Sequence, residues 1–425
     1  MAKPVLKKHQ NQRMVLRTAI GLLIIAGMVL TYQWLMSIRQ DPADLLPGNS
    51  TGMIAAVEYT ESGSKIIVLQ DGKVTEVPGH TGTSRDESPV WRPDGQRLFF
   101  SSDREENTFN IFRWRPGGDK SERRSVGSRS KSAPWFGPEG YVGVNESGLI
   151  TSGGVVMEYS PKDGSTKQIL PPPQGSGTQD EEGGVGDQFS VAYSKFGTGF
   201  EKARYGQNRD FIIASMRRDT GRVLIYQNLL PDSRGMLPAP IALFAGNNLD
   251  FDVNAEGKVA VSILGAQVPD ETNIPAEFIK NGEVVLPFRN AMVVLDPRKP
   301  AETTYLFASK DDNLAMSKPV FSQDGSRFLI GLGSVKNEGN FEPQALGIFG
   351  TGAAEASPPT IIFEKPVFDY AWFPNNRDIV FARKEGDYRL LYQSSADGSD
   401  VKLISPSKGE FGAPAVSPTY FPAKN

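Results

Sequence analysis

The sequence contains no cysteine and only two histidines, His9 and His80, among its 425 residues. The lack of cysteine excludes disulfides, thiolate nucleophiles, zinc sites with cysteine ligands and lipidation at a cysteine. Two histidines are too few for a multi-histidine metal centre. The composition does not indicate a nucleic-acid partner, because 46 Lys and Arg are balanced by 49 Asp and Glu. The hydrophobic content of 39% is enough for a large folded core.

The amino-terminal end has the pattern of a membrane anchor. Residues 1–17 are a basic tail without an acidic residue, and residues 18–38 are an uncharged, mostly apolar run. As a helix, this run would span about 31 Å, enough for a hydrocarbon core of about 30 Å. The basic tail predicts a cytoplasmic amino terminus, so the chain after residue 38 is expected in the periplasm or outside the cell.

Two alternatives to the anchor remain open. A cleaved secretory signal has a shorter apolar region, and no small-residue cleavage site follows the run 18–38. The second alternative is that residues 18–38 form a buried helix of a soluble domain. Residues 39–52 are rich in proline and glycine and are predicted to be a linker.

A repeated unit runs through residues 53–425. Its clearest copy, 88–120, has a short strand that ends at Trp91, a Pro-Asp-Gly turn, a second strand through Phe100, and a third strand before another turn. Similar patterns begin at residues 318 and 369, and weaker ones at 133, 191 and 251. Aligning the turns places one large apolar residue before each of them: Trp91, Phe136, Tyr193, Val253, Phe321 and Trp372. The turns themselves, among them Asp94-Gly95 and Asp324-Gly325, tolerate the left-handed backbone of a tight reversal.

Units of four short strands that recur along a chain predict an all-β fold, here a β-propeller. Six complete units are recognisable, and residues 53–77 supply three further strands without a first one. Residues 412–420 look like a first strand with nothing after it. We therefore expect 412–420 to pair with 53–77 and close a ring of seven blades, with six or eight as alternatives.

The pattern of the clearest unit, Trp-Arg-Pro-Asp-Gly-Gln-Arg-Leu-Phe-Phe at 91–100, resembles the TolB-type WD40-like (PD40) repeat. The resemblance implies a propeller located in the cell envelope that binds other proteins, in some members fused to a peptidase domain. The chain departs from TolB in its predicted membrane anchor, in having no amino-terminal α/β domain, and in a predicted extra blade.

Three segments stand out from the repeat. Residues 170–187 are rich in proline, glycine and acidic residues and are expected to form a mobile loop. Residues 265–290 are long enough for a short helix or an extra hairpin, and long loops on a rigid scaffold are common binding sites. The basic segment 113–131 fits either a site for an acidic partner or, as we favour, a solvated edge strand.

Few residues suggest chemistry. The sequence Gly-Asn-Ser-Thr-Gly at 48–52 matches a nucleophile motif but lies in the predicted linker, so we interpret it as coincidence. His80 is expected to be a solvated loop residue. Asp250, Asp252 and Asn254 have the alternate spacing of calcium ligands, which makes them weak candidates for a metal site. The repeat explains the same residues as one face of a first strand, directed toward the central channel.

The sequence therefore predicts a membrane-anchored, extracytoplasmic β-propeller that is not an enzyme and needs no cofactor. Its expected role is a protein-binding module or scaffold in a cell-envelope assembly, with envelope or membrane proteins as partners. The alternative is a sensor for a small ligand or ion, or a hydrolase or lyase, that uses the central channel with Asp250 and Asp252.

Overall fold

The computed structural model describes residues 52–418, apart from gaps at 106, 126–128, 137–147, 153, 161–164, 173–190, 234–236, 271–273, 275 and 337–339. The chain divides into two compact units, Met1–Ser50 and Thr51–Asn425, and every described residue belongs to the second. The predicted span 18–38 and most of the predicted linker and acidic loop lie outside the described residues. Within the part of the chain that the structure describes, no helix is long and apolar enough to cross a membrane.

Three of the sheets contain four strands each, joined in chain order as antiparallel meanders. The first consists of β4 (Asp86–Trp91), β5 (Leu98–Ser102), β6 (Asn110–Trp114) and β7 (Ser121–Arg123). The second consists of β8 (Lys131–Trp135), β9 (Gly148–Ser152), β10 (Val155–Tyr159) and β11 (Thr166–Leu170). The third consists of β21 (Ala315–Phe321), β22 (Arg327–Lys336), β23 (Asn340–Gly350) and β24 (Thr360–Phe363).

A seven-stranded sheet joins two such groups through one long strand, β15 (Ile241–Val253). The amino-terminal half of β15 pairs with β14, and its carboxyl-terminal half pairs with β16. It is therefore the last strand of one group and the first of the next. The other members are β12 (Gly199–Tyr205), β13 (Phe211–Arg218), β14 (Gly221–Asn228), β16 (Val259–Gln267), β19 (Asn290–Leu295) and β20 (Thr304–Ser309).

The remaining large sheet combines strands from both ends of the described chain. β29 (Glu410–Val416) pairs antiparallel with β1 (Ile54–Tyr59), and β2 (Ser64–Gln70) and β3 (Lys73–Glu76) follow β1. Its other half consists of β25 (Val367–Trp372), β26 (Asp378–Glu385), β27 (Tyr388–Ser395) and β28 (Lys402–Leu403).

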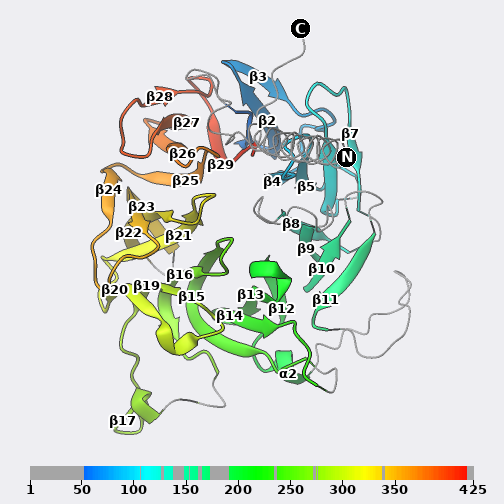
Figure 1. The fold of residues 1–425 in the computed structure, drawn as a ribbon. Coiled ribbons are helices and arrows are strands. Elements are labelled where there is room, and N and C mark those ends of the chain that lie inside the picture. Colours follow the sequence, from blue (N-terminus) through cyan, green and yellow to red (C-terminus); the bar gives the residue numbers. More distant parts are fainter. Residues whose placement is uncertain are drawn as a thin grey trace, which may run out of the picture. The chain divides into compact units, whose positions relative to one another are not determined.

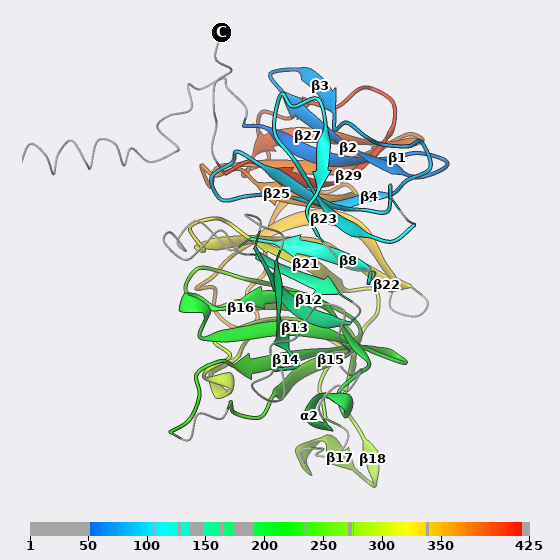
Figure 2. The ribbon, with the colours of Figure 1, turned by 90° about the vertical axis from the view of Figure 1, so that its right-hand side faces the viewer.

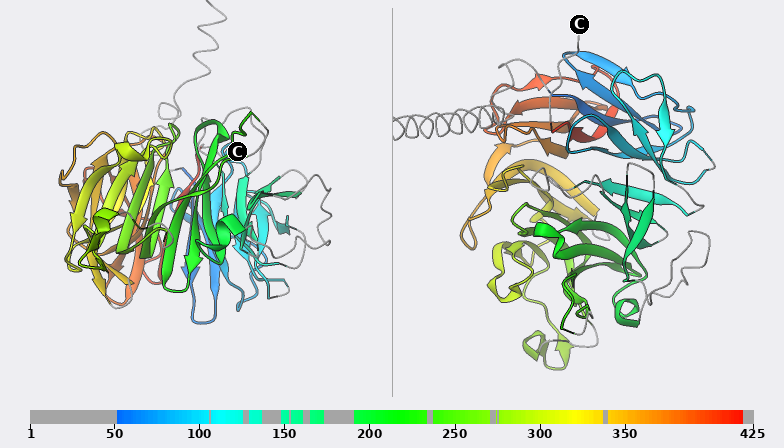
Figure 3. Two further views of the ribbon diagram at one scale, coloured as in Figure 1. Left: turned by 90° about the horizontal axis from the view of Figure 1, so that it is seen from below. Right: turned by 45° about the vertical axis from the view of Figure 1, so that its right-hand side comes forward.

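The groups follow one another around a common centre in chain order (Figure 1). Their first strands contact one another in a complete cycle: β4 with β8, β8 with β12, β12 with β15, β15 with β21, β21 with β25, β25 with β29, and β29 with β4. Views from other sides show the sheets standing side by side (Figures 2 and 3). The prediction of an all-β fold is confirmed, and this arrangement is a β-propeller. The described α-helix, α2 (Val191–Ser194), has a single turn.

The core lies between neighbouring sheets. One cluster packs Val57 of β1 and Ile66 of β2 against Trp91, Phe100 and Phe112 of the sheet β4–β7. Middle strands such as β5 and β19 are buried along their whole length because a sheet covers each face, so they read as short apolar runs instead of alternating patterns. Each large apolar side chain buried in this way contributes about 1.5–3 kcal/mol to the stability of the fold.

The tryptophans of the aligned column join neighbouring sheets. The indole N–H of Trp91 donates a hydrogen bond to the carbonyl of Ala415 at 3.0 Å, and that of Trp372 donates to Val320 at 2.9 Å. Phe321 and Phe136 are also buried. In the turns that follow, Gly95 and Gly325 have φ of 66° and 68°, where a side chain would be strained. Asp94 and Asp324 each accept a hydrogen bond from the backbone N–H two residues on, at 3.0 Å.

The assignment of Tyr193 to a first strand is wrong. Tyr193 lies in α2, and the equivalent strand is β12, in which Tyr205 pairs with Ile212 as Trp91 pairs with Leu98. The turn after Tyr205 contains Asn208, which takes φ of 54° without a glycine beside it. This turn has no Asp-Gly pair. The segment around Gly197 and Gly199 therefore resembled a turn of the repeat more closely than the turn after Tyr205 does.

Candidate functional site

Four of the first strands share a backbone irregularity that shapes the centre of the propeller. Ser88, Ala133, Lys318 and Ala413 have φ between 45° and 53°, and a proline follows each of them. The ladder shifts register at each of these positions, as it does at a β-bulge. A positive φ is uncommon for residues other than glycine and persists only where the surrounding structure enforces it. Residues held in this way are concentrated at functional sites.

A cavity of about 220 Å³ lies where two of these irregular segments meet the strands opposite. Its lining comes from β12, β15, β21, β25 and β29, the first strands of their groups. Six of its lining residues are charged, three of each sign: Lys202, Arg204, Asp250, Asp252, Lys318 and Asp369. Tyr370, Pro319 and Pro414 complete much of the wall. The cavity is therefore lined by many charged side chains, but the net charge of its lining is zero.

Lys202 and Asp250 form the first ion pair of the cavity. Lys202 Nζ lies 2.7 Å from Asp250 Oδ1 and also donates to the carbonyl of Phe251 at 2.5 Å. The backbone N–H of Phe251 donates to the same carboxylate oxygen at 2.8 Å. Desolvation alone would raise the pKa of Asp250, but the ammonium of Lys202 and these hydrogen bonds outweigh it, so this pKa lies below its ordinary value.

Lys318 and Asp369 form a second ion pair across β21 and β25. The other oxygen of Asp369 accepts a hydrogen bond from the Ala413 backbone N–H at 3.2 Å. Desolvation opposes both charges, but their mutual attraction prevails, so the pKa of Asp369 is lowered and that of Lys318 is raised. Tyr370 donates to the carbonyl of Lys318 at 2.6 Å, and burial raises the pKa of this phenol well above its ordinary value.

Arg204 and Asp252 are a looser pair. Arg204 Nε lies 3.9 Å from Asp252 Oδ1, too far for a hydrogen bond. Asp252 instead accepts a hydrogen bond from the backbone N–H of Phe321 at 2.9 Å. Desolvation raises the pKa of Asp252, and the nearby cations offset this only in part. The guanidinium of Arg204 lies over the ring of Trp135, with Cζ 5.1 Å from the ring centroid.

The candidate calcium ligands do not converge on one point. Asp250 and Asp252 face cations in the cavity, whereas Asn254 is buried in the turn after β15. There its side-chain oxygen accepts hydrogen bonds from the N–H groups of Glu256 and Lys258, at 3.1 and 2.9 Å. Among the residues that the structure describes, no group of three or more His, Cys, Asp or Glu side chains could hold a metal ion.

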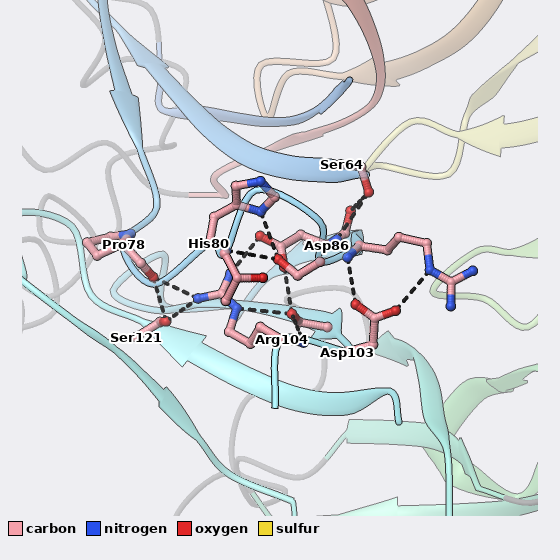
Figure 4. Close-up of polar contacts among 11 residues, drawn as sticks. Ser64, Pro78, His80, Asp86, Asp103, Arg104 and Ser121 are labelled. Carbon is pink, nitrogen blue, oxygen red and sulfur yellow. Dashed lines mark hydrogen bonds and ion pairs between the residues drawn. The ribbon is translucent and has the colours of Figure 1, made fainter. Parts of the chain in front are cut away.

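His80 lies beside a polar network between the sheet that contains β2 and β3 and the sheet β4–β7 (Figure 4). Its Nδ1 is 2.9 Å from Ser84 Oγ, and the side chain is half-buried instead of fully solvated. The neighbouring carboxylate of Asp86 is fully buried and engaged by Arg104 and Ser102, each at 2.6 Å. A catalytic triad needs a carboxylate that orients the histidine. The carboxylate of Asp86 instead holds Arg104, whose guanidinium also donates to the carbonyl of Pro78 at 2.7 Å.

A second, apolar cavity of about 270 Å³ lies farther along the same first strands. It is lined by Trp91, Phe321, Trp372, Pro374 and Pro418, among others. The serine motif at 48–52 lies outside the described residues except for Gly52.

The insertion at 265–290 contains an extra hairpin, β17 (Ile279–Lys280) and β18 (Glu283–Val284), which projects from the rim of the propeller (Figures 1 and 2). Ile279 and Val284 are backbone partners in this hairpin and are 48% and 46% exposed, and Val285 is 39% exposed. Three neighbouring exposed apolar side chains on one protrusion form a small apolar surface, and contiguous apolar surface is typical of interaction sites.

The basic segment 113–131 includes β7, an edge strand of its sheet. Two of its arginines form ion pairs, Arg113 with Glu122 at 2.6 Å and Arg123 with Glu105 at 3.6 Å. Charged, paired side chains on an edge strand fit protection against sheet-to-sheet association.

Comparisons with known proteins give likenesses of fold. No protein-family model matches the chain. A search of curated proteins also finds no significant match. Among solved structures, TolB from Acinetobacter baumannii is 14% identical with a TM-score of 0.46, covering 88% of this chain and 68% of that one.

Two further solved structures are similar at the same level. The Cps50 (Swd1) β-propeller domain of Myceliophteria thermophila is 9% identical with a TM-score of 0.48, covering 78% of this chain and 90% of that one. An oligogalacturonate lyase in complex with manganese is 10% identical with a TM-score of 0.47, covering 84% of this chain and 85% of that one. The assignment of the fold rests on the hydrogen-bonded sheets and on the cycle of contacts between first strands.

Proposed function

We propose that this protein is a non-catalytic protein-binding module or scaffold, a propeller that displays a docking hairpin at its rim. The observation that carries the proposal is the exposed apolar surface of β17 and β18, formed by Ile279, Val284 and Val285. The ring beneath it is held by buried cores between the sheets, so the hairpin is presented on a rigid support. Three exposed aliphatic side chains on one protrusion offer a partner an apolar contact of the kind found in the buried core of an interface.

The non-catalytic part of the proposal follows from the state of the channel carboxylates. Asp250 and Asp369 are paired with lysines, and Asp252 accepts a backbone hydrogen bond beside Arg204. A general base needs a lone pair free to take a proton, and a nucleophile needs an activating base. The pairing of Asp250 and Asp369 with lysines therefore supports a non-catalytic role.

We propose further that the propeller has seven blades, that residues 18–38 anchor it in a membrane, and that it acts in a cell-envelope assembly outside the cytoplasm. The support for seven is that the described strands, apart from the hairpin β17–β18, fall into seven groups of four when β15 is shared and β29 is placed before β1. The support for the anchor and for its orientation is the basic tail followed by the apolar run. Tethering of this kind raises the effective concentration of the module near membrane partners.

The docking hairpin is tested by affinity purification of the full-length chain from solubilised membranes of its native host. The double variant Ile279→Asp, Val284→Asp places two charges on the proposed contact, and Val74→Asp places one on β3, where the side chain is 41% exposed. We expect a defined set of proteins to accompany the wild type and the Val74→Asp chain but not the double variant. Recovery of the wild type alone, or of the same set with the double variant, would contradict the proposal.

A further inference from the structure

We infer that the charged cavity at the centre of the propeller binds a small zwitterion of the α-amino acid class, with the ligand carboxylate on Arg204 and its ammonium on Asp252. This site is separate from the docking hairpin, and its test does not depend on the scaffold function.

The first step is the unused hydrogen-bonding capacity of Arg204. Its Nε is buried and has no hydrogen-bond partner among the residues that the structure describes. Its Nη1 donates to the carbonyl of Ala203 at 2.9 Å. A buried N–H donor without a hydrogen-bond partner lowers the stability of the fold. A ligand oxygen bound to this guanidinium would remove that cost. The stacking on Trp135 holds the guanidinium in place.

The second step is the charge of the cavity as a whole. The three cations and three carboxylates of its wall cancel, and two of the three pairs are already in contact. A ligand with a net charge would bring an uncompensated charge into a desolvated space, which is strongly unfavourable. A neutral ligand with separated charges adds no net charge and can still satisfy both members of the loose pair.

The third step is the geometry of that loose pair. Arg204 Nε and Asp252 Oδ1 lie 3.9 Å apart, side by side and not joined by a hydrogen bond. An α-amino acid carries its carboxylate and its ammonium on the same carbon, so its two charges lie close together and match this spacing with opposite sign. The guanidinium provides donors for a bidentate contact with the carboxylate. Asp252 provides the acceptor for the ammonium.

Size and backbone geometry fit the same class of ligand. The cavity volume of about 220 Å³ is below the range of roughly 300–1,000 Å³ that is usual for drug-sized ligands. Part of its wall is the strained backbone of Lys318-Pro319 and Ala413-Pro414, with φ of 51° and 45° at the residues before proline. Such strain persists where the surrounding fold enforces it and is concentrated at ligand sites.

The test is differential scanning fluorimetry of the purified full-length chain with each of the twenty free L-amino acids, followed by calorimetric titration of any that bind. We expect at least one amino acid to raise Tm by roughly 2 °C at ten times its Kd. Its des-amino acid and its decarboxylated amine, which keep one charge each, are expected to produce no shift. If no amino acid raises Tm, or if either one-charge analogue binds as tightly, the inference is overturned.

Two variants locate the binding site. Arg204→Lys keeps the charge but loses the planar pair of donors, and Asp252→Asn keeps an acceptor but loses the charge. Each is expected to weaken binding at least tenfold, whereas Arg115→Lys, on an exposed turn after β6, is expected to leave binding unchanged. Circular dichroism verifies that the variants fold, and Asp252→Asn provides an independent result if Arg204→Lys does not. Unchanged affinity in a folded Arg204 or Asp252 variant would contradict the assignment.

Discussion

Ile54, at the start of the described chain, is the antiparallel backbone partner of Val416, near its end. The pairing continues to Tyr59 and Glu410, so one sheet is built from both ends of the chain. This sheet lies between its neighbours in the ring, and β29 contacts both β25 and β4. The free edges that each end would otherwise expose are thereby removed.

The indole hydrogen bonds between sheets are expected to contribute measurably to stability. Trp91→Phe and Trp372→Phe each leave a backbone carbonyl, of Ala415 or Val320, without its donor. We expect each variant to lower the free energy of unfolding by about 1–3 kcal/mol in urea denaturation. Unchanged urea midpoints would show that these hydrogen bonds do not hold the sheets together.

The buried pair of Asp86 and Arg104 is expected to be far more important than an exposed pair. Both side chains are almost fully buried, and the guanidinium of Arg104 also lies close to the ring centroids of Phe100 and Phe112, at 4.9 and 5.0 Å. Asp86→Ala leaves a buried guanidinium without its carboxylate, so we expect a loss of about 3–5 kcal/mol in the free energy of unfolding. Glu122→Ala breaks a more exposed pair and should cost no more than about 1 kcal/mol. Equal losses in the two variants would refute this ranking.

Asp252 gives a prediction on pH. Burial raises its pKa, so the folded state holds the proton more tightly than the unfolded chain and ionisation opposes folding. This cost is absent below the ordinary carboxyl pKa of about 3.9, grows as the pH rises toward the raised pKa, and is fully present above that raised pKa. Asp252→Asn is therefore expected to raise the free energy of unfolding at pH 7 relative to wild type, with the difference vanishing near pH 3.5. Urea denaturation across this range measures it.

Asp369→Asn is the matched control, because the pKa of Asp369 is shifted in the opposite direction to that of Asp252. The pKa of Asp369 is lowered in the folded state, so its charge stabilises the fold above the ordinary pKa and that stability is lost as the pH falls through the folded-state value. The Asn variant should be less stable than wild type at pH 7 and equal to it at low pH. The same sign of change at pH 7 in both variants would contradict the assignment of the two carboxylates.

The membrane anchor proposed for residues 18–38 is tested by fractionation. We expect the full-length chain to sediment with membranes and to resist extraction by alkaline carbonate, because an uncharged apolar run of this length is long enough to span the bilayer as a helix. A chain without residues 2–38 should remain in the supernatant. Carbonate extraction of the full-length protein would contradict the anchor.

The repeat was predictable from sequence where the turn chemistry was strong. Asp94-Gly95 and Asp324-Gly325 mark turns by residues that the backbone geometry requires, and the strands on either side follow from them. The unit around Tyr205 was missed because Asn208 adopts the left-handed conformation without an adjacent glycine. In that unit, contacts with neighbouring sheets determine which residues form the first strand. The local sequence pattern does not contain this information.

The candidate site was predictable only in part. The alternation of Asp250 and Asp252 singled out one wall of the cavity, but Lys202, Arg204 and Lys318 come from other strands and meet these acids only in space. One signal was present and not used: a proline follows the strained residue in four first strands, as at Lys318-Pro319. Proline inside a strand marks an irregularity, and here two of these irregularities line the cavity.

The closed ring is tested most directly by a disulfide between Ala55 and Ala415, which are backbone partners across β1 and β29. Antiparallel partners have Cα atoms about 4.5–5.5 Å apart, within the range that a disulfide spans, and the chain has no other cysteine to compete. We expect Ala55→Cys, Ala415→Cys to form an intramolecular cross-link on mild oxidation, seen as a mobility shift in non-reducing electrophoresis. The control pair Ala55→Cys, Ala308→Cys, with Ala308 on β20 of another sheet, should not form one. A folded protein in which residues 55 and 415 do not cross-link, or do so no better than the control, would contradict the closure.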